Sequence, residues 1–362
     1  MSTTTSGAAT RVRPAGRSAS SLQARMLPSW TPWAAVATSL VLALLGFLAS
    51  GGANVAGIVA VALVIFLAGM HLVSTLVEGR RKAFDRLASH LVVLAFGLAL
   101  LPLISLAIDT VSHGLARFDI TFFTYSMRNV VGDGGGAVHA LTGTLYVTGI
   151  ASLIAVPIGL LTAIYLAEYG RGSLARAITF LVDVMTGIPS IVAGLFAYAL
   201  MTILFGPGTV NGLAGALGLS VLMIPIVVRA TEELLRLVPN ELREAAYALG
   251  VPKWRTILWV VLPTAASGII SGVILAVARI VGETAPLMIA AGFTASLNSN
   301  PLANPMMTLP VFVYDQYAYP GVLREAYTER AWTGTLTLIL LVMGLNLIGR
   351  LIASRVAGKA GR

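Results

Sequence analysis

The sequence predicts an all-α integral membrane protein with about eight transmembrane helices. Its composition is the first reason: 57% of the 362 residues are hydrophobic and 11% are charged, against roughly 45–50% and about 25% in an average soluble domain. A monomer this apolar lacks the polar surface that water requires, so lipid must solvate much of it. The second reason is eight long stretches of low charge, each compatible with the roughly 17–25 residues of a membrane-spanning helix. They are residues 32–50, 53–76, 87–108, 141–166, 177–204, 212–229, 264–290 and 332–353.

The first two stretches are separated only by Gly51 and Gly52. Each is long enough to cross a bilayer, so we expect a hairpin rather than one broken segment. Residues 1–30, rich in Ser, Thr, Ala and Arg, are predicted to form a disordered basic leader. A cleaved signal peptide is the alternative, but the leader is long for that role and a second span follows directly. The stretch 212–229 is the shortest of the eight.

The distribution of basic residues predicts the orientation, because Lys and Arg are retained on the cytoplasmic side. With the N-terminus inside, only four basic residues fall in the opposite loops: Arg117, Arg128, Arg324 and Arg330. We therefore predict a multi-pass protein of the bacterial cytoplasmic membrane, with the N-terminus and the tail 356–362 both cytoplasmic. This topology and attraction to anionic lipid headgroups account for the net charge of +9, so no nucleic-acid site is expected.

A polar island at residues 231–263 interrupts the apolar spans. Glu241 to Leu249 is predicted to be a helix that ends at Gly250, and a second helical stretch leads from Lys253 into the next span. The spacing of Glu244, Ala245, Ala246 and Gly250, with Leu262 and Pro263 after them, resembles that of the cytoplasmic EAA loop by which permease subunits of bacterial ABC importers dock onto their ATPase. An ordinary surface hairpin packed on the membrane is the alternative. The resemblance implies that a separate ATPase couples to Glu244, Ala245, Ala246, Gly250, Leu262 and Pro263.

Ionisable residues inside spans are costly and usually functional. Arg279 and Glu283 are four residues apart in the penultimate stretch, where they would share a helix face and could form an ion pair. A guanidinium also offers planar paired donors suited to a tetrahedral oxyanion. We therefore predict an anion path at Arg279, with simple mutual neutralisation as the alternative. Asp183 is a further candidate partner.

Three segments narrow the resemblance: Arg279 to Pro286, Gly187 to Leu195, and Pro225 to Glu233. Together they are similar to the PstA-type permease of the phosphate ABC importer, over roughly residues 87–355. The resemblance implies a six-helix type I ABC importer permease core at 87–355, with an additional hairpin and cytoplasmic loop at 31–86. It also implies that Arg279, Glu283 and Arg229 lie on the substrate pathway.

The same resemblance implies the partners. They are a PstC-type permease in a heterodimer, two copies of a PstB-type ATPase, and an external PstS-type phosphate-binding protein. The chain would translocate inorganic phosphate, and ATP and Mg would bind in the ATPase rather than here. Two long outer loops, 109–140 and 291–330, are predicted to form the docking surface for the binding protein, although their aromatic residues could instead anchor helix ends in the interface.

Other chemistry is not expected in this chain. It has no G-x-x-x-x-G-K-[ST] phosphate loop, so we predict that it is not an enzyme. It also has no cysteine, and its four histidines are scattered without the spacing of a metal pair. Two alternatives stay open: an ABC permease for another oxyanion or small solute, and an ATPase-independent secondary transporter.

Overall fold

The computed structural model describes residues 26–49 and 54–360, and it divides into two compact units with a boundary between Ser105 and Leu106. Within this part of the chain the regular structure is entirely helical. Seven helices are long and apolar enough to cross a membrane, and a bent helix pair would make eight. The predicted fold class is therefore confirmed. The predicted leader up to residue 25 and the Gly51-Gly52 turn lie outside the described residues.

The first unit contains α1 (Thr31–Ala49), α2 (Val55–Glu78) and the beginning of α3 (Arg80–Gly114). The α1 and α2 helices contact each other, as expected for a hairpin. Beyond them, the structure differs from the predicted loop, because residues 80–86 already form the first turns of α3. The unit boundary also lies at Ser105, inside α3, whereas the sequence places the start of the permease core near residue 87.

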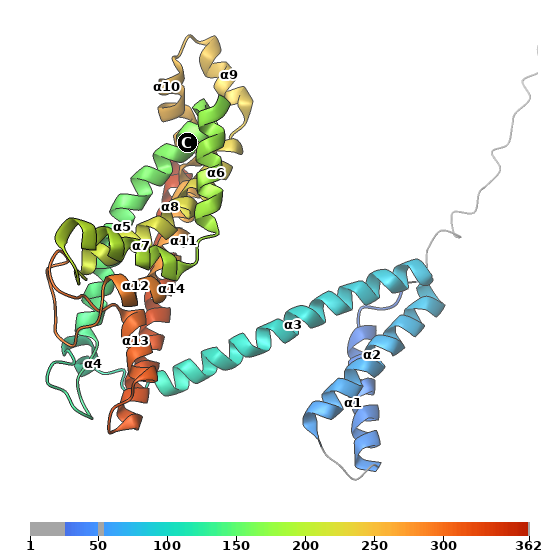
Figure 1. Cartoon of the computed structure of the whole chain (residues 1–362). Helices are drawn as coiled ribbons and strands as arrows, with labels where there is room; N and C mark the ends of the chain where they lie inside the picture. Colours follow the sequence, from blue (N-terminus) through green and yellow to red (C-terminus); the bar gives the residue numbers. More distant parts are fainter. Residues whose placement is uncertain (1–25, 50–53, 361–362) are drawn as a thin grey trace, which may run out of the picture. The chain divides into compact units, whose positions relative to one another are not determined.

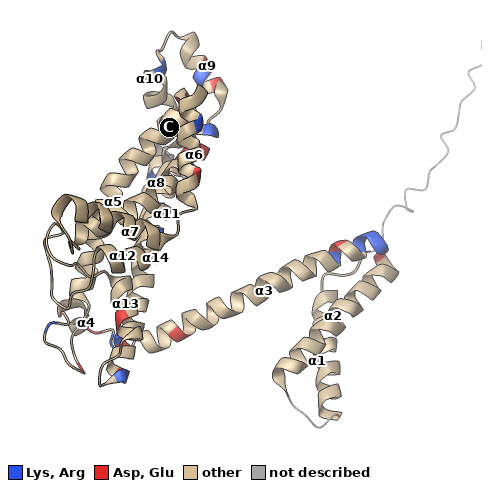
Figure 2. Ribbon diagram, in the orientation of Figure 1, with Lys and Arg blue, Asp and Glu red and all other residues tan. Residues whose placement is uncertain are grey.

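The second unit begins with the end of α3 and contains all the remaining helices (Figure 1). They are α4 (Ile120–Thr124), α5 (Val138–Ile164), the π-helical turn η2 (Tyr165–Tyr169), α6 (Gly172–Thr186), α7 (Ser190–Phe205), α8 (Gly212–Arg236), α9 (Asn240–Ala248), α10 (Lys253–Thr256), the π-helical turn η3 (Ile257–Val261), α11 (Leu262–Val281), α12 (Ala285–Ala290), α13 (Leu309–Ala318) and α14 (Arg324–Ala360). In Figure 1, α9 and α10 lie at one end of this unit, and α4 and α13 lie towards the other. Charged residues gather near these two ends and are sparse between them (Figure 2).

The centre of the second unit is the packing of α5 against α8. The span in α8 contains the shortest predicted stretch, yet 56% of it is buried, more than any other span. Its first turns contain Gly212, Gly215 and Gly218, and small residues let helices approach closely. From the other side, Gly159 of α5 faces Val227, where an added Cβ would lie 2.7 Å from a methyl carbon.

One predicted span is broken. The stretch 177–204 forms two helices, α6 and α7, that meet at an angle of 108°. The sequence Gly187-Ile188-Pro189 explains the break, because proline disfavours a helical conformation in the residue before it and provides no backbone donor. The predicted span 264–290 is also interrupted, because α11 ends at Val281 and α12 starts at Ala285.

The glycine-rich segment 132–136 is held in place by arginine side chains. Arg330 of α14 is fully buried and donates to the carbonyl oxygens of Gly132 (2.7 Å) and Gly134 (3.1 Å). Its Nε also donates to Gln316 Oε1 of α13 at 2.8 Å. Arg117, which lies three residues beyond the end of α3, donates to the Gly135 carbonyl at 3.3 Å. Arg330 thus joins this loop to α14 and α13, and Arg117 adds a contact from the segment after α3.

Candidate functional site

A cavity of about 360 Å³ lies at the bend between α6 and α7. Arg279 and Glu283 supply its charged groups, and Thr186 and Ser190 supply hydroxyls. Apolar residues complete the wall, including Pro225 from the interior of α8. The break in α6–α7 therefore does more than bend the chain: it places polar side chains at the depth of the surrounding spans. We call this space the bend cavity.

Two of the sequence segments that define the resemblance meet next to this cavity. Gly194 of α7 packs against Pro286 of α12, and a Cβ at Gly194 would lie 2.6 Å from Pro286 Cα. No real Cβ contact is that short, so only glycine permits this approach. The Gly187-to-Leu195 and Arg279-to-Pro286 segments thus form one packed wall. The two segments are far apart in the sequence, so a local sequence pattern does not predict that they pack together.

The predicted relation between Arg279 and Glu283 is wrong in one respect. The helix α11 ends at Val281, so Glu283 lies beyond it and does not share its face with Arg279. Among the described residues, no carboxylate lies within 4.0 Å of the Arg279 guanidinium. Both side chains nonetheless line the bend cavity. The structure therefore places a guanidinium and a carboxylate at one cavity without pairing them.

Arg229, the third predicted pathway residue, has different surroundings. Its guanidinium bonds Asp183 of α6 and lies 3.3 Å from Glu232, whose carboxylate is 5% exposed and also binds Arg236 at 2.6 Å. Arg229 does not line the bend cavity. This ion-pair chain connects α6 with the end of α8 that leads into the polar island. It also identifies the partner of Asp183, which the sequence left open.

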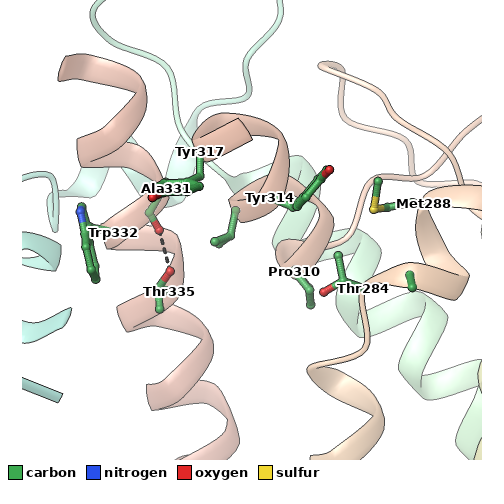
Figure 3. Close-up of a pocket in the computed structure, with 10 residues that line it drawn as sticks. Thr284, Met288, Pro310, Tyr314, Tyr317, Ala331, Trp332 and Thr335 are labelled. Carbon is green, nitrogen blue, oxygen red and sulfur yellow. Dashed lines mark hydrogen bonds between the residues drawn. The ribbon is translucent and has the colours of Figure 1, made fainter. Parts of the chain in front are cut away.

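A second cavity, of about 610 Å³, lies between α12, α13 and α14 (Figure 3). Its wall is mainly apolar and aromatic, with Tyr314, Tyr317 and Trp332 among the lining residues and the hydroxyls of Thr284 and Thr335 on it. Thr284 follows Glu283 directly, so consecutive residues of the α11–α12 break line two different cavities. The break therefore contributes to the walls of both cavities.

The polar island forms the predicted helix-turn-helix. The α9 helix ends in a turn in which Gly250 has a φ of +76°, a conformation that favours glycine, and Val251 N–H donates to the Ala246 carbonyl at 3.1 Å. The prediction that Gly250 ends this helix is confirmed. Glu244 and Ala245 are exposed, while Ala246 is buried. Tyr247, Leu249 and Trp254 add exposed hydrophobic surface that the apolar spans do not cover.

The other two predicted coupling residues have a different position. Leu262 and Pro263 are the first residues of α11, and Leu262 packs onto the cluster formed by Leu235, Val238 and Val261. They lie where the island joins the span. Glu168, an acidic residue after the apolar stretch 141–166, also contacts the island, although no motif in the sequence marks it. Its carboxylate lies 2.7 Å from Arg243 of α9 and is 5% exposed.

Comparison with known proteins places this architecture in a family. Residues 155–358 match the family described as the binding-protein-dependent transport system inner membrane component. The phosphate transport system permease protein PstA of Mycobacterium leprae is 44% identical over 284 residues, which cover 76% of this chain and 91% of that protein. The PstA protein of Yersinia pestis is 38% identical over 292 residues, covering 78% and 96%. The chain belongs to the PstA family of binding-protein-dependent transport permeases.

Solved structures agree with this fold for the permease. A chain from the crystal structure of a bacterial ABC transporter that imports the acidic polysaccharide alginate aligns with a TM-score of 0.52. The alignment covers 75% of this permease and 96% of that chain at 13% identity, so it shows the fold alone. The expected ABC importer permease fold is thus confirmed, and the permease is a multi-pass membrane protein.

Proposed function

We propose that this permease forms the membrane path by which an ATP-driven importer carries inorganic phosphate into the cytoplasm. The main supporting observation is that the Arg279 guanidinium lines the bend cavity and has no carboxylate within 4.0 Å in the part of the chain that the structure describes. A guanidinium offers several N–H donors in a planar fork that matches the oxygens of a phosphate. The names of the relatives, which are phosphate transport system permeases, point to the same substrate.

Glu283 adds a second selection step within this proposal. A carboxylate accepts hydrogen bonds and repels a fully ionised oxyanion. Inorganic phosphate at neutral pH retains at least one proton, so its hydroxyl can donate to Glu283 while its other oxygens accept from Arg279. Sulfate and molybdate at the same pH have no such proton. The opposed charges on one cavity thus favour phosphate over the rival oxyanions.

We take the partner subunits from the PstA family, to which this permease belongs. A PstC-type permease would complete the translocation path as a heterodimer, a PstS-type protein would deliver phosphate at the outer loops, and two PstB-type ATPases would bind the exposed face of α9 and α10. ATP and Mg would be bound by those ATPases. Both termini would lie in the cytoplasm, on the side of the polar island.

Reconstituted vesicles test the proposal. The purified four-component complex should take up radiolabelled phosphate when ATP is enclosed, and a 100-fold excess of sulfate or molybdate should not compete. The variant Glu283→Gln should keep phosphate uptake within about tenfold and lose part of the discrimination against sulfate. Uptake of sulfate or molybdate in preference to phosphate by the unaltered complex would refute phosphate as the substrate.

A further inference from the structure

Two consecutive residues of the turn η2, which follows α5, bind side chains from both helices of the polar island. Arg243 of α9 binds the Glu168 carboxylate through Nη2 at 2.7 Å and Nε at 3.1 Å. Lys253, the first residue of α10, donates from Nζ to the Glu168 carbonyl oxygen and lies 4.8 Å from the centre of the Tyr169 ring. We call these four residues the coupling anchor.

The anchor holds both arms of the island. The helices α9 and α10 flank the turn at Gly250, and each contributes one cation to the Glu168–Tyr169 pair. Arg243 also donates to the carbonyl oxygens of Leu235 (2.9 Å) and Val238 (2.7 Å), so it joins α9 to the end of α8 as well. A movement of the island therefore cannot leave the end of α5 where it was without breaking charge-assisted hydrogen bonds.

The burial of the anchor makes this link stiff. The side chains of Arg243 and Glu168 are 14% and 5% exposed. Water screens such a pair poorly, and removing one partner leaves the other buried without compensation. Many exposed ion pairs contribute little, because solvent competes for both groups. The Arg243–Glu168 pair is instead largely buried, and Arg243 also donates to main-chain carbonyl oxygens.

The local backbone provides the means of movement. The anchor residues Glu168 and Tyr169 lie in the π-helical turn η2, and the π-helical turn η3 directly follows α10. Single π-helical turns within α-helices are rare and occur often at functional sites. In this permease η2 lies where the island contacts the segment after α5, and η3 lies where the island continues into α11. Each can absorb a change of helical register where the island joins α5 or α11.

The α5 helix directly precedes η2 and packs against α8, which supplies part of the wall of the bend cavity. In this contact Gly159 lies directly against Val227, and Pro225 of the same α8 segment lines the cavity. We propose that the coupling anchor transmits displacement of the polar island into α5 and α8, and so moves one wall of the bend cavity. Glu168, Arg243 and Lys253 are thus positioning residues for transport. This inference rests on the proposed ATP-driven function but not on phosphate as the substrate.

The test uses the absence of cysteine from the chain. The variant Ile188→Cys places a single thiol of this subunit on the bend cavity. In the assembled importer, with the other subunits made free of cysteine, a water-soluble thiol reagent should label it at different rates with and without a non-hydrolysable ATP analogue. Glu168→Gln should reduce this nucleotide-dependent change at least about tenfold, equivalent to ~1.4 kcal/mol of coupling free energy. ATPase copurification should be retained.

Lys253→Met is the second, milder variant, because it keeps the Glu168–Arg243 pair and the length of the side chain. It should reduce the labelling change by about threefold. Asp85→Asn, at an exposed carboxylate of α3, and Lys82→Met, both in the first unit, are the matched controls and should leave the change as it is. A second measurement, phosphate uptake per ATP hydrolysed, should fall in the same order.

Two outcomes would overturn the inference. One is a labelling change within about twofold of the parent protein in both anchor variants. The other is loss of ATPase copurification in both, which would make the anchor part of the docking site or of the fold. Failure of the phosphate proposal would look different: the complex would prefer another oxyanion while the labelling change still depended on Glu168.

Discussion

The bend cavity and the coupling anchor each contain an arginine, Arg279 and Arg243, and the two guanidinium groups differ in how many of their donors are bonded. Arg279 lines the bend cavity, and among the described residues no carboxylate lies within 4.0 Å of its guanidinium. Arg243 bonds one carboxylate and main-chain oxygens from two preceding residues, and its side chain is only 14% exposed. A guanidinium whose donors are occupied fixes structure, whereas one with free donors can receive a ligand. The chemical type of the residue does not decide between these roles.

The largest effect should come from removing the free guanidinium. Arg279→Gln should lower phosphate uptake by at least about 100-fold, equivalent to ~2.7 kcal/mol, because it removes the charge-assisted contact that the proposed site makes with phosphate. Assembly should be retained, since no ion pair is broken. Uptake into vesicles at matched protein level is the measurement. Arg350→Gln, at an exposed arginine of α14, is the control and should transport normally.

Exchanging the two charges sharpens the same point. Arg279→Glu combined with Glu283→Arg keeps the net charge of the cavity but moves the cation beyond the end of α11. We expect the complex to assemble and to remain inactive. Restored uptake in the double variant would mean that charge balance, rather than the position of the guanidinium, determines transport.

The next effect concerns the wall of the bend cavity. Gly194→Val should destabilise the packing of α7 on α12 by about 1–3 kcal/mol, because the added atoms meet the backbone of Pro286. Thermal unfolding of the purified complex measures this. Gly149→Val is the control, since nothing lies within 4 Å of the position of its Cβ. Equal melting temperatures for the two variants would contradict the close approach.

At the polar island the expected effect is smaller and has a different cause. A Cβ at Gly250 has open space around it, but φ is +76°. Gly250→Val should therefore cost roughly 1–2 kcal/mol through backbone strain and reduce ATPase copurification by about 5-fold to 30-fold. Membrane insertion should not change. Gly250→Asn, which tolerates this conformation, should bind nearly as well as the parent; an equally large loss in that variant would point to a side-chain clash in the interface.

The smallest effect should follow removal of the N-terminal segment, since the bend cavity and the coupling anchor both belong to the second unit. Deleting residues 2–86 removes α1, α2 and the first turns of α3 and should preserve the orientation of the later spans. Phosphate-stimulated ATPase activity should persist. If the truncated chain inserts and assembles but shows no such activity, the first unit is part of the transport machinery.

The sequence was sufficient for the properties that depend on neighbouring residues. Apolar length and low charge identify a span wherever it packs, so about eight spans could be counted in advance. The end of the α9 helix at Gly250 could also be predicted, because the residues that cap a helix lie within a single turn of its end. The break at Gly187-Ile188-Pro189 had a local signal too, although its 108° angle did not.

Only the tertiary structure decided which charged residues are free and which are paired. Arg243 and Glu168 are 75 positions apart, and Arg229 and Asp183 are 46 apart. Arg279 and Glu283, by contrast, are four apart and not paired, because the helix ends between them. The occupancy of a donor depends on every group that folding brings within hydrogen-bonding distance, and no local pattern contains that information. The same reason hides the contact of Gly194 with Pro286, which exists only where two distant backbones meet.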